Sequence, residues 1–220
     1  TTRLVGSEMC IRDRRVCYVS PLTLKNQKEI FPESAHKMYW APLPFYYKND
    51  EQGSTVNKYN NYGYFGDYAP VSRDLAPFYA AAKNIGVNVN ICGNPSNLFA
   101  QTDKITIYPR LQLNELKPIE DKTNVLVFLC NRKGGQIPGK IYQYSATYKT
   151  ILFILDGTDE EKKVLKSYFE QFNRYIFCEN TVEDIECAIK LIENNDFGNV
   201  KNEPIDEFNP AKTIMKVLEG

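Results

Sequence analysis

The chain has 220 residues, of which 43% are hydrophobic, and its 27 basic side chains balance its 27 acidic ones. This length is enough for one sizeable core, or for one domain and part of another. The neutral balance argues against a general nucleic-acid binder, which has a basic surplus. No apolar run reaches the roughly 18–20 residues that a transmembrane helix needs, and no secretory signal opens the chain. A cytoplasmic location is therefore expected.

Cysteine and histidine usage limits the chemistry further. None of the six cysteines forms a C-x-x-C pair, and Cys92, Cys130 and Cys178 lie in or at the end of predicted strands. We interpret them as buried, reduced thiols. The only histidine is His36, which argues against a histidine-based metal site or a Ser-His-Asp triad.

Residues 1–14 do not have the pattern of a natural fold. They contain LVGSEMCIRD, which looks like a translated transposase-adaptor sequence and is interpreted as a non-native segment. The natural protein is therefore expected to extend further upstream. Residues 15–20 and 37–40 have strand composition, and a helix that begins at Pro21 is predicted between them. The polar stretch that follows, to about residue 59, predicts a surface linker.

From residue 61 onward, strand patterns and helix patterns alternate. The predicted strands are residues 61–66, 87–93, 104–108, 124–130, 150–155 and 175–178. The fourth and fifth, NVLVFLC and TILFIL, are continuous apolar runs, which are typical of strands covered on both faces. The alternation predicts parallel, right-handed crossovers and an α/β, Rossmann-like sheet with helices on both of its faces. A last helix is predicted over residues 210–218.

The stretch between the two apolar runs is rich in glycine and in positive charge. It contains three glycines and three cations without an acid among them: Gly134, Gly135, Gly139, Arg132, Lys133 and Lys140. A predicted helix begins at Lys140 and continues to Tyr148. A glycine-rich loop that enters a helix N-terminus presents free N–H groups to an anion. The pattern therefore predicts a phosphate or diphosphate site, with Lys140 as its principal cation.

The same stretch carries a family resemblance. PGKIYQYSATYKTIL resembles the motif K-x-x-E-Y-x-A-x-G-K-P-x-L in the nucleotide-sugar-binding C-terminal domain of GT-B glycosyltransferases. Five positions match, namely Lys140, Tyr144, Ala146, Lys149 and Leu152. Three differ: Gln143 replaces the glutamate, Tyr148 the glycine and Thr150 the proline. Many members also have an earlier glutamate, and its place here is Gly135.

The resemblance implies a division of the chain and a reaction. Residues 61–205 would be the donor-binding domain, the C-terminal half of a GT-B fold. Residues 15–60 would be the end of the acceptor-side N-terminal domain and the hinge, and residues 206–220 a helix that returns toward that domain. The implied reaction transfers a sugar from a nucleotide diphosphate sugar to a glycan or lipid-linked acceptor, without an obligatory metal or cofactor. The fragment alone is expected to be inactive, no catalytic residue is assigned, and peripheral association of the full-length protein with the inner face of the membrane is compatible with this reaction.

The resemblance also implies which residues bind the donor. YFGDY matches the first glycine loop of the family and contributes Gly66 and Asp67. The basic loop and the helix contribute the others: Arg132, Lys133, Gly134, Gly135, Gly139, Lys140 and Gln143. In the family, the glutamate at the place of Gln143 holds the ribose hydroxyls, and an amide oxygen is a weaker acceptor. Two simpler interpretations stay open, namely that Asp67 caps the next turn and that Gln143 is an exposed helix residue.

Two other functions are compatible with the sequence. The changes at Gly135 and Gln143 favour a non-catalytic relative that serves as a nucleotide-binding or partner-subunit module. An NAD-binding Rossmann domain is the third interpretation. It is the weakest, because no G-x-G-x-x-G follows the first strand of the main domain.

Overall fold

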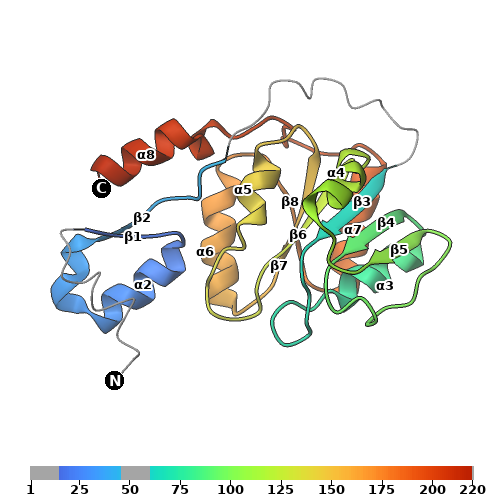
Figure 1. Cartoon of the computed structure of the whole chain (residues 1–220), viewed down its shortest axis with the longest axis horizontal. Helices are drawn as coiled ribbons and strands as arrows, with labels where there is room; N and C mark the ends of the chain where they lie inside the picture. The colour runs from blue at the N-terminus through green and yellow to red at the C-terminus, as the bar shows by residue number, and fades with distance from the viewer. Residues whose placement is uncertain (1–14, 46–59, 220) are drawn as a thin grey trace.

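The computed structural model describes residues 15–45 and 60–219 of the chain (Figure 1). The predictions for the adaptor-like segment and for most of the linker lie outside these residues. Within them, the strands form one sheet of two strands and one of six. The larger sheet carries the candidate site.

The six-stranded sheet is entirely parallel. Its strands are β3 (Asn61–Phe65), β4 (Asn88–Cys92), β5 (Ile105–Tyr108), β6 (Val125–Leu129), β7 (Thr150–Leu155) and β8 (Ile176–Glu179). They lie in the order β5-β4-β3-β6-β7-β8, and each neighbouring pair is parallel. With helices on both faces, this confirms the predicted Rossmann-like α/β fold.

The two apolar runs form the interior strands β6 and β7. Every residue of both strands is buried, and they pair in register from Val125 with Thr150 to Leu129 with Ile154. Because side chains alternate between the faces of a sheet, such continuous burial requires a packed layer on each side.

Helices supply those two layers (Figure 1). On one face, α3 (Ala76–Ile85) and α7 (Val182–Glu193) pack against each other and against a cluster that includes Val127 and Ile154. On the other face lie α4 (Leu113–Asp121), α5 (Lys140–Ser145) and α6 (Asp159–Glu170). Ile141 of α5 and Phe169 of α6 belong to the cluster built on Phe128 and Phe153. The site described below lies on the side of α4 and α5.

Helix α5 is shorter than the sequence predicts, because it ends at Ser145 rather than at Tyr148. The hydroxyl of Thr147 donates to the carbonyl of Tyr144 at 2.8 Å, which competes with a further helical turn. The buried Arg174 donates to the carbonyls of Thr147 and Lys149 at 2.7 and 2.6 Å. These bonds satisfy carbonyl groups that a continued helix would use, so the chain turns into β7 early.

The N-terminal residues form a smaller unit. It contains β1 (Val16–Tyr18), α2 (Pro21–Ile30), a 3-10 helix (Pro32–Lys37) and β2 (Met38–Trp40), with β1 and β2 parallel. The C-terminal helix α8 (Pro210–Glu219) lies beside it. Arg15 and Tyr39 donate hydrogen bonds to the carbonyls of Leu218 and Val217.

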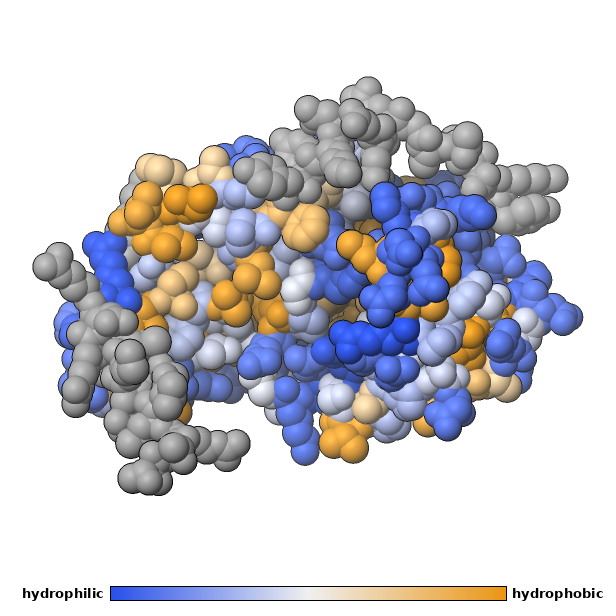
Figure 2. Space-filling view, in the orientation of Figure 1, coloured by the Kyte–Doolittle hydropathy of each residue, from blue (hydrophilic) through white to orange (hydrophobic). Residues whose placement is uncertain are grey.

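Apolar side chains remain on the surface of α8 (Figure 2). The exposed ones are Ile214, Met215, Val217 and Leu218. In the part of the chain that the structure describes, no helix has the length and apolar character to cross a membrane.

Candidate functional site

The strand order makes the sheet edge next to Gly66 the candidate position for a ligand. After β5 the chain crosses the sheet to β6, which lies beside β3. The connections that leave β3 and β6 therefore run in opposite directions, and open α/β sheets bind ligands at the carboxyl ends of such strands. Gly66 follows β3 directly, and Asn131 lies two residues after β6.

A cavity of about 340 Å³ lies at this edge of the sheet. Three of the residues that line it are cations and one is an acid; we call it the cation cavity. Its lining is Phe65, Gly66, Asp67, Arg73, Cys92, Gly93, Arg110, Leu111, Leu116 and Lys140. The site therefore combines open backbone with positive charge, which suits an anionic ligand.

Glycines allow the loops after β3 and β4 to touch at the cavity. A Cβ atom on Gly93 would lie 2.0 Å from the carbonyl oxygen of Gly66, so only glycine fits there. Gly66 donates its N–H to the carbonyl of Cys92 at 2.9 Å. An added Cβ on Gly66 would make only ordinary contacts, 3.6 Å from the hydroxyl of Tyr64 and 3.7 Å from a guanidinium nitrogen of Arg73. Gly66 itself lines the cation cavity, so a ligand there can approach its backbone.

Asp67 holds this loop together. One carboxylate oxygen accepts the N–H of Asn94 at 3.0 Å, and the other pairs with Arg110 at 3.3 Å. Its carbonyl accepts from Arg73 at 3.1 Å, while Nε of Arg73 donates to Asn131 at 2.7 Å. Asp67 therefore positions the two arginines of the cavity and connects the ends of β3, β4 and β6.

Lys140 reaches the cavity from the start of α5. Its ammonium lies 3.0 Å from Glu120 of α4, and 6.0 and 5.8 Å from the ring centres of Phe65 and Tyr144. A cation at that distance from aromatic rings is weakly stabilised by them. Lys140 is thus held at the cavity by one carboxylate and two rings.

Cys92 also lines the cation cavity, as a neutral group. Burial raises the pKa of its thiol to about 12. The thiolate, not the thiol, is the nucleophile. Cys92 therefore contributes packing at neutral pH, as do the buried Cys130 and Cys178, and the predicted burial of these three thiols is confirmed.

The basic loop that precedes α5 has different surroundings. Arg132 donates to the carbonyl of Pro70 at 2.7 Å and lies 3.9 Å from both Asp74 and Asp156. Lys133, Gly134 and Gly139 are exposed. None of these four residues lines the cation cavity.

Gly135 is covered by the N-terminal unit. Its φ is +61°, and a Cβ atom there would lie 2.7 Å from Cβ of Leu22. The buried hydroxyl of Ser20 donates to its carbonyl at 2.5 Å. The position that holds a glutamate in many GT-B enzymes is therefore closed to a side chain here, both by sterics and by backbone conformation.

The N-terminus of α5 offers less to an anion than the sequence suggests. The helix has only six residues, and the N–H of Ile141 already donates to the carbonyl of Pro138 at 3.2 Å. The expectation that free N–H groups near residues 139–141 meet a diphosphate therefore does not hold for Ile141. Positive charge at the site comes from side chains instead.

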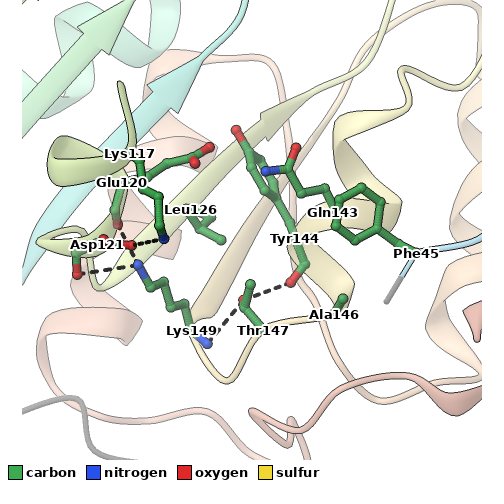
Figure 3. A pocket seen from close by; sticks show the side chains of 10 residues that line it. All are labelled: Phe45, Lys117, Glu120, Asp121, Leu126, Gln143, Tyr144, Ala146, Thr147 and Lys149. Carbon is green, nitrogen blue, oxygen red and sulfur yellow. Dashed lines mark hydrogen bonds and ion pairs between the residues drawn. The ribbon is translucent and has the colours of Figure 1, made fainter. Parts of the chain in front are cut away.

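Gln143 faces a second cavity, of about 180 Å³, between α4 and α5 (Figure 3). We call it the amide cavity; it is lined by Phe45, Lys117, Glu120, Asp121, Leu126, Gln143, Tyr144, Ala146, Thr147 and Lys149. The motif residue Lys149 donates to the carbonyl groups of Glu120 and Asp121 at the end of α4. A cation at a helix C-terminus is favourable. Lys149 therefore has a structural contact here.

Of the sequence-predicted residues, the structure brings Gly66, Asp67 and Lys140 together at one cavity. It adds Arg73 and Arg110 to that cavity, and it places Glu120 of the amide cavity beside Lys140; none of the three was predicted from the sequence. Arg110 carried a usable signal, because it lies two residues after a predicted strand and so at the same edge of the sheet as Gly66. In residues 15–45 and 60–219, no group of three or more His, Cys, Asp or Glu side chains is placed to hold a metal ion.

No known family pattern matches this chain, and no curated protein sequence does. Among solved structures, it is similar to the apo form of the lipopolysaccharide outer core galactosyltransferase WaaB. The TM-score is 0.62 at 9% identity, over 94% of this chain and 61% of that one. The chain thus spans less than two thirds of that enzyme, and it has a GT-B glycosyltransferase-like fold.

Two further structures align less closely. The spinosyn rhamnosyltransferase SpnG has a TM-score of 0.44 at 13% identity, over 82% of this chain and 51% of that one. A structure of accessory secretory proteins 1, 2 and 3 in Streptococcus pneumoniae has a TM-score of 0.43 at 11% identity, over 94% and 43%.

Proposed function

We propose that this chain is the donor-binding part of a glycosyltransferase and binds a nucleotide diphosphate sugar in the cation cavity. The observation that carries the proposal is the convergence of Arg73, Arg110 and Lys140 on open backbone at Gly66, where the strand order reverses. The fold shared with a GT-B enzyme agrees with this assignment.

The chemistry of sugar transfer explains why cations belong there. The bond between the anomeric carbon and the diphosphate breaks, and the acceptor hydroxyl forms the new bond and gives up its proton. The nucleoside diphosphate leaves with added negative charge. Cations already in place around that charge lower the barrier, because no solvent needs to reorganise.

The test is calorimetric titration of the chain with UDP, GDP and ADP. At least one should bind, and Arg73→Ala and Lys140→Ala should each weaken it about tenfold or more, as loss of one charge-assisted contact implies. Arg132→Ala is the matched control, since Arg132 pairs outside the cavity; its affinity should stay within about twofold. If none of the three nucleotides binds, the proposal fails.

A specific observation favours a second candidate, a non-catalytic nucleotide-binding module. Gly135 is closed to a side chain by Leu22, and Gln143 carries no charge, so neither position supplies a carboxylate. Such a module would bind the nucleotide but would not hydrolyse or transfer the sugar when its full-length protein is assayed. Sugar release from a radiolabelled donor separates the two.

The remaining parts of the assignment are proposals of the same kind. The acceptor would be a glycan or a lipid-linked sugar, and the reaction would need neither a metal nor a further cofactor. The protein would act in the cytoplasm, where nucleotide sugars are the substrates, at the inner face of the membrane. The exposed apolar side chains of α8, together with Lys212 and Lys216, suit a peripheral contact of that type.

A further inference from the structure

An ion pair links the linings of the two cavities. Glu120 lines the amide cavity, and its partner Lys140, 3.0 Å away, lines the cation cavity. The Glu120 side chain is only 16% exposed. Figure 3 shows Glu120 and Gln143 on the lining of the same cavity, from α4 and α5. A single ligand can therefore contact Lys140 through one group and Glu120 through the adjacent group.

Charge decides which chemical group suits each cavity. A phosphate is attracted by Arg73, Arg110 and Lys140 but repelled by Glu120. A carboxylate only accepts hydrogen bonds, so hydroxyl groups are its natural neutral partners, and two adjacent hydroxyls match its two oxygens. The amide of Gln143 can accept or donate beside them.

The ion pair couples the two contacts. A diphosphate in the cation cavity competes with Glu120 for the ammonium of Lys140. Moving Lys140 would leave the Glu120 carboxylate mostly buried without its cation, which is costly unless new donors replace it. A ligand that supplies an anion and an adjacent pair of hydroxyls satisfies both groups at once. A ribonucleoside diphosphate has this composition.

We propose that Glu120 accepts the ribose hydroxyls of the bound nucleoside diphosphate, while Lys140 exchanges from Glu120 to the diphosphate. This inference rests on the proposed function and specifies how that site distinguishes its ligand. Glu120 thereby selects ribose over deoxyribose. Gln143 lines the same cavity and can contribute a further hydrogen bond. The sequence pattern of α4 does not mark Glu120 as a binding residue.

The test compares UDP with 2′,3′-dideoxy-UDP, and GDP with its dideoxy analogue, by calorimetry. The unmodified chain should bind the ribose form about tenfold or more tightly than the dideoxy form. Glu120→Gln keeps the shape of the side chain and should remove most of this discrimination. Its affinity for the dideoxy form should stay the same or rise, because Lys140 is freed for the diphosphate.

The control is Glu186→Gln on α7, a carboxylate that is 24% exposed, lies 3.8 Å from Lys190 and lines neither cavity. It should discriminate as the unmodified chain does. A second variant, Glu120→Asp, keeps the charge on a shorter arm and should retain part of the discrimination, and thermal melts check that all variants fold. If UDP or GDP binds but Glu120→Gln still prefers ribose by the original factor, this inference is wrong and the proposed function stands. If no nucleotide binds, both are wrong.

Discussion

Two loops of this chain each contain glycine and arginine but have opposite surroundings. In the Gly66 loop (residues 66–75), the glycine lines the cation cavity, and an added Cβ would make only ordinary contacts, at 3.6 Å or more. In the Gly135 loop (residues 131–139), the glycine has a φ of +61° and lies under Leu22. One glycine leaves room for a ligand; the other leaves room for a neighbouring helix.

This difference shows that a basic, glycine-rich loop is not in itself an anion site. Arg132 of the Gly135 loop is paired with Asp74, Asp156 and a carbonyl group, whereas Arg73 of the Gly66 loop faces the cation cavity. The number of cations in a loop matters less than the direction in which the fold points them. The following predictions test the contrast between the two loops.

The largest effect is expected for Gly135→Glu, which restores the residue of the GT-B motif. A side chain at positive φ is strained, and this one would overlap with Leu22. Together with the cost of overpacking, the free energy of unfolding should fall by about 3 kcal/mol in urea titrations. The control is Gly134→Ala, where φ is +93° but no atom lies within 4 Å, and the loss should be nearer ~1 kcal/mol. Equal losses in the two variants would show that Leu22 does not cover Gly135.

Ser20→Ala should have the next largest effect. The buried hydroxyl donates to the carbonyl of Gly135 and also caps α2 by accepting from Thr23. Its loss should cost about 1–2 kcal/mol of unfolding free energy, because it leaves a buried acceptor without a partner and removes a helix cap. Ser72→Ala is the counterpart in the Gly66 loop. Its hydroxyl is exposed, with a bond of 3.4 Å, so a change below about 0.5 kcal/mol is expected.

High pH should lower the free energy of unfolding through Cys130, which lies between the end of β6 and the Gly135 loop. Burial raises the pKa of the Cys130 thiol from 9.0 to about 12. Between these values the unfolded chain loses the proton while the folded chain keeps it, so stability is full below pH 9 and falls as pH rises. The slope from this thiol is at most about 1.4 kcal/mol per pH unit. Cys130→Ala should have a shallower fall between pH 9 and 10.5 in urea titrations; an unchanged slope would contradict the buried thiol.

The smallest effect on stability is expected for Gly66→Ala. The nearest atom to the added methyl group would be 3.6 Å away, an ordinary contact, so the free energy of unfolding should change by less than about 0.5 kcal/mol. The methyl group would lie against Arg73, which lines the cation cavity, however, and UDP or GDP affinity should fall about threefold or more. A stability loss like that of Gly135→Glu would mean that both loops are packed, and the contrast between them would disappear.

Much of the fold could be predicted because its signals are local. The runs at β6 and β7 are apolar at every position, and only strands covered on both faces suit that pattern. Thr158 and Glu161 form the capping box that opens α6. The C-terminal end of α5 could not be predicted in this way, because the hydrogen bonds that follow it come from Arg174, which lies 25 and 27 residues further along the chain. No local pattern contains that contact.

The candidate site divides in the same way. The sequence by itself determined that the sheet is parallel and that Gly66 follows a strand, because hydrophobic periodicity and turn residues act over a few positions. It also placed Lys140 at the start of a helix. Only the tertiary structure decided that Arg73 and Arg110 join Lys140, that Leu22 covers Gly135, and that Glu120 meets Lys140 between two cavities. These contacts join residues that are 20 or more positions apart, so packing of the whole sheet and its helices sets them, and no local propensity does.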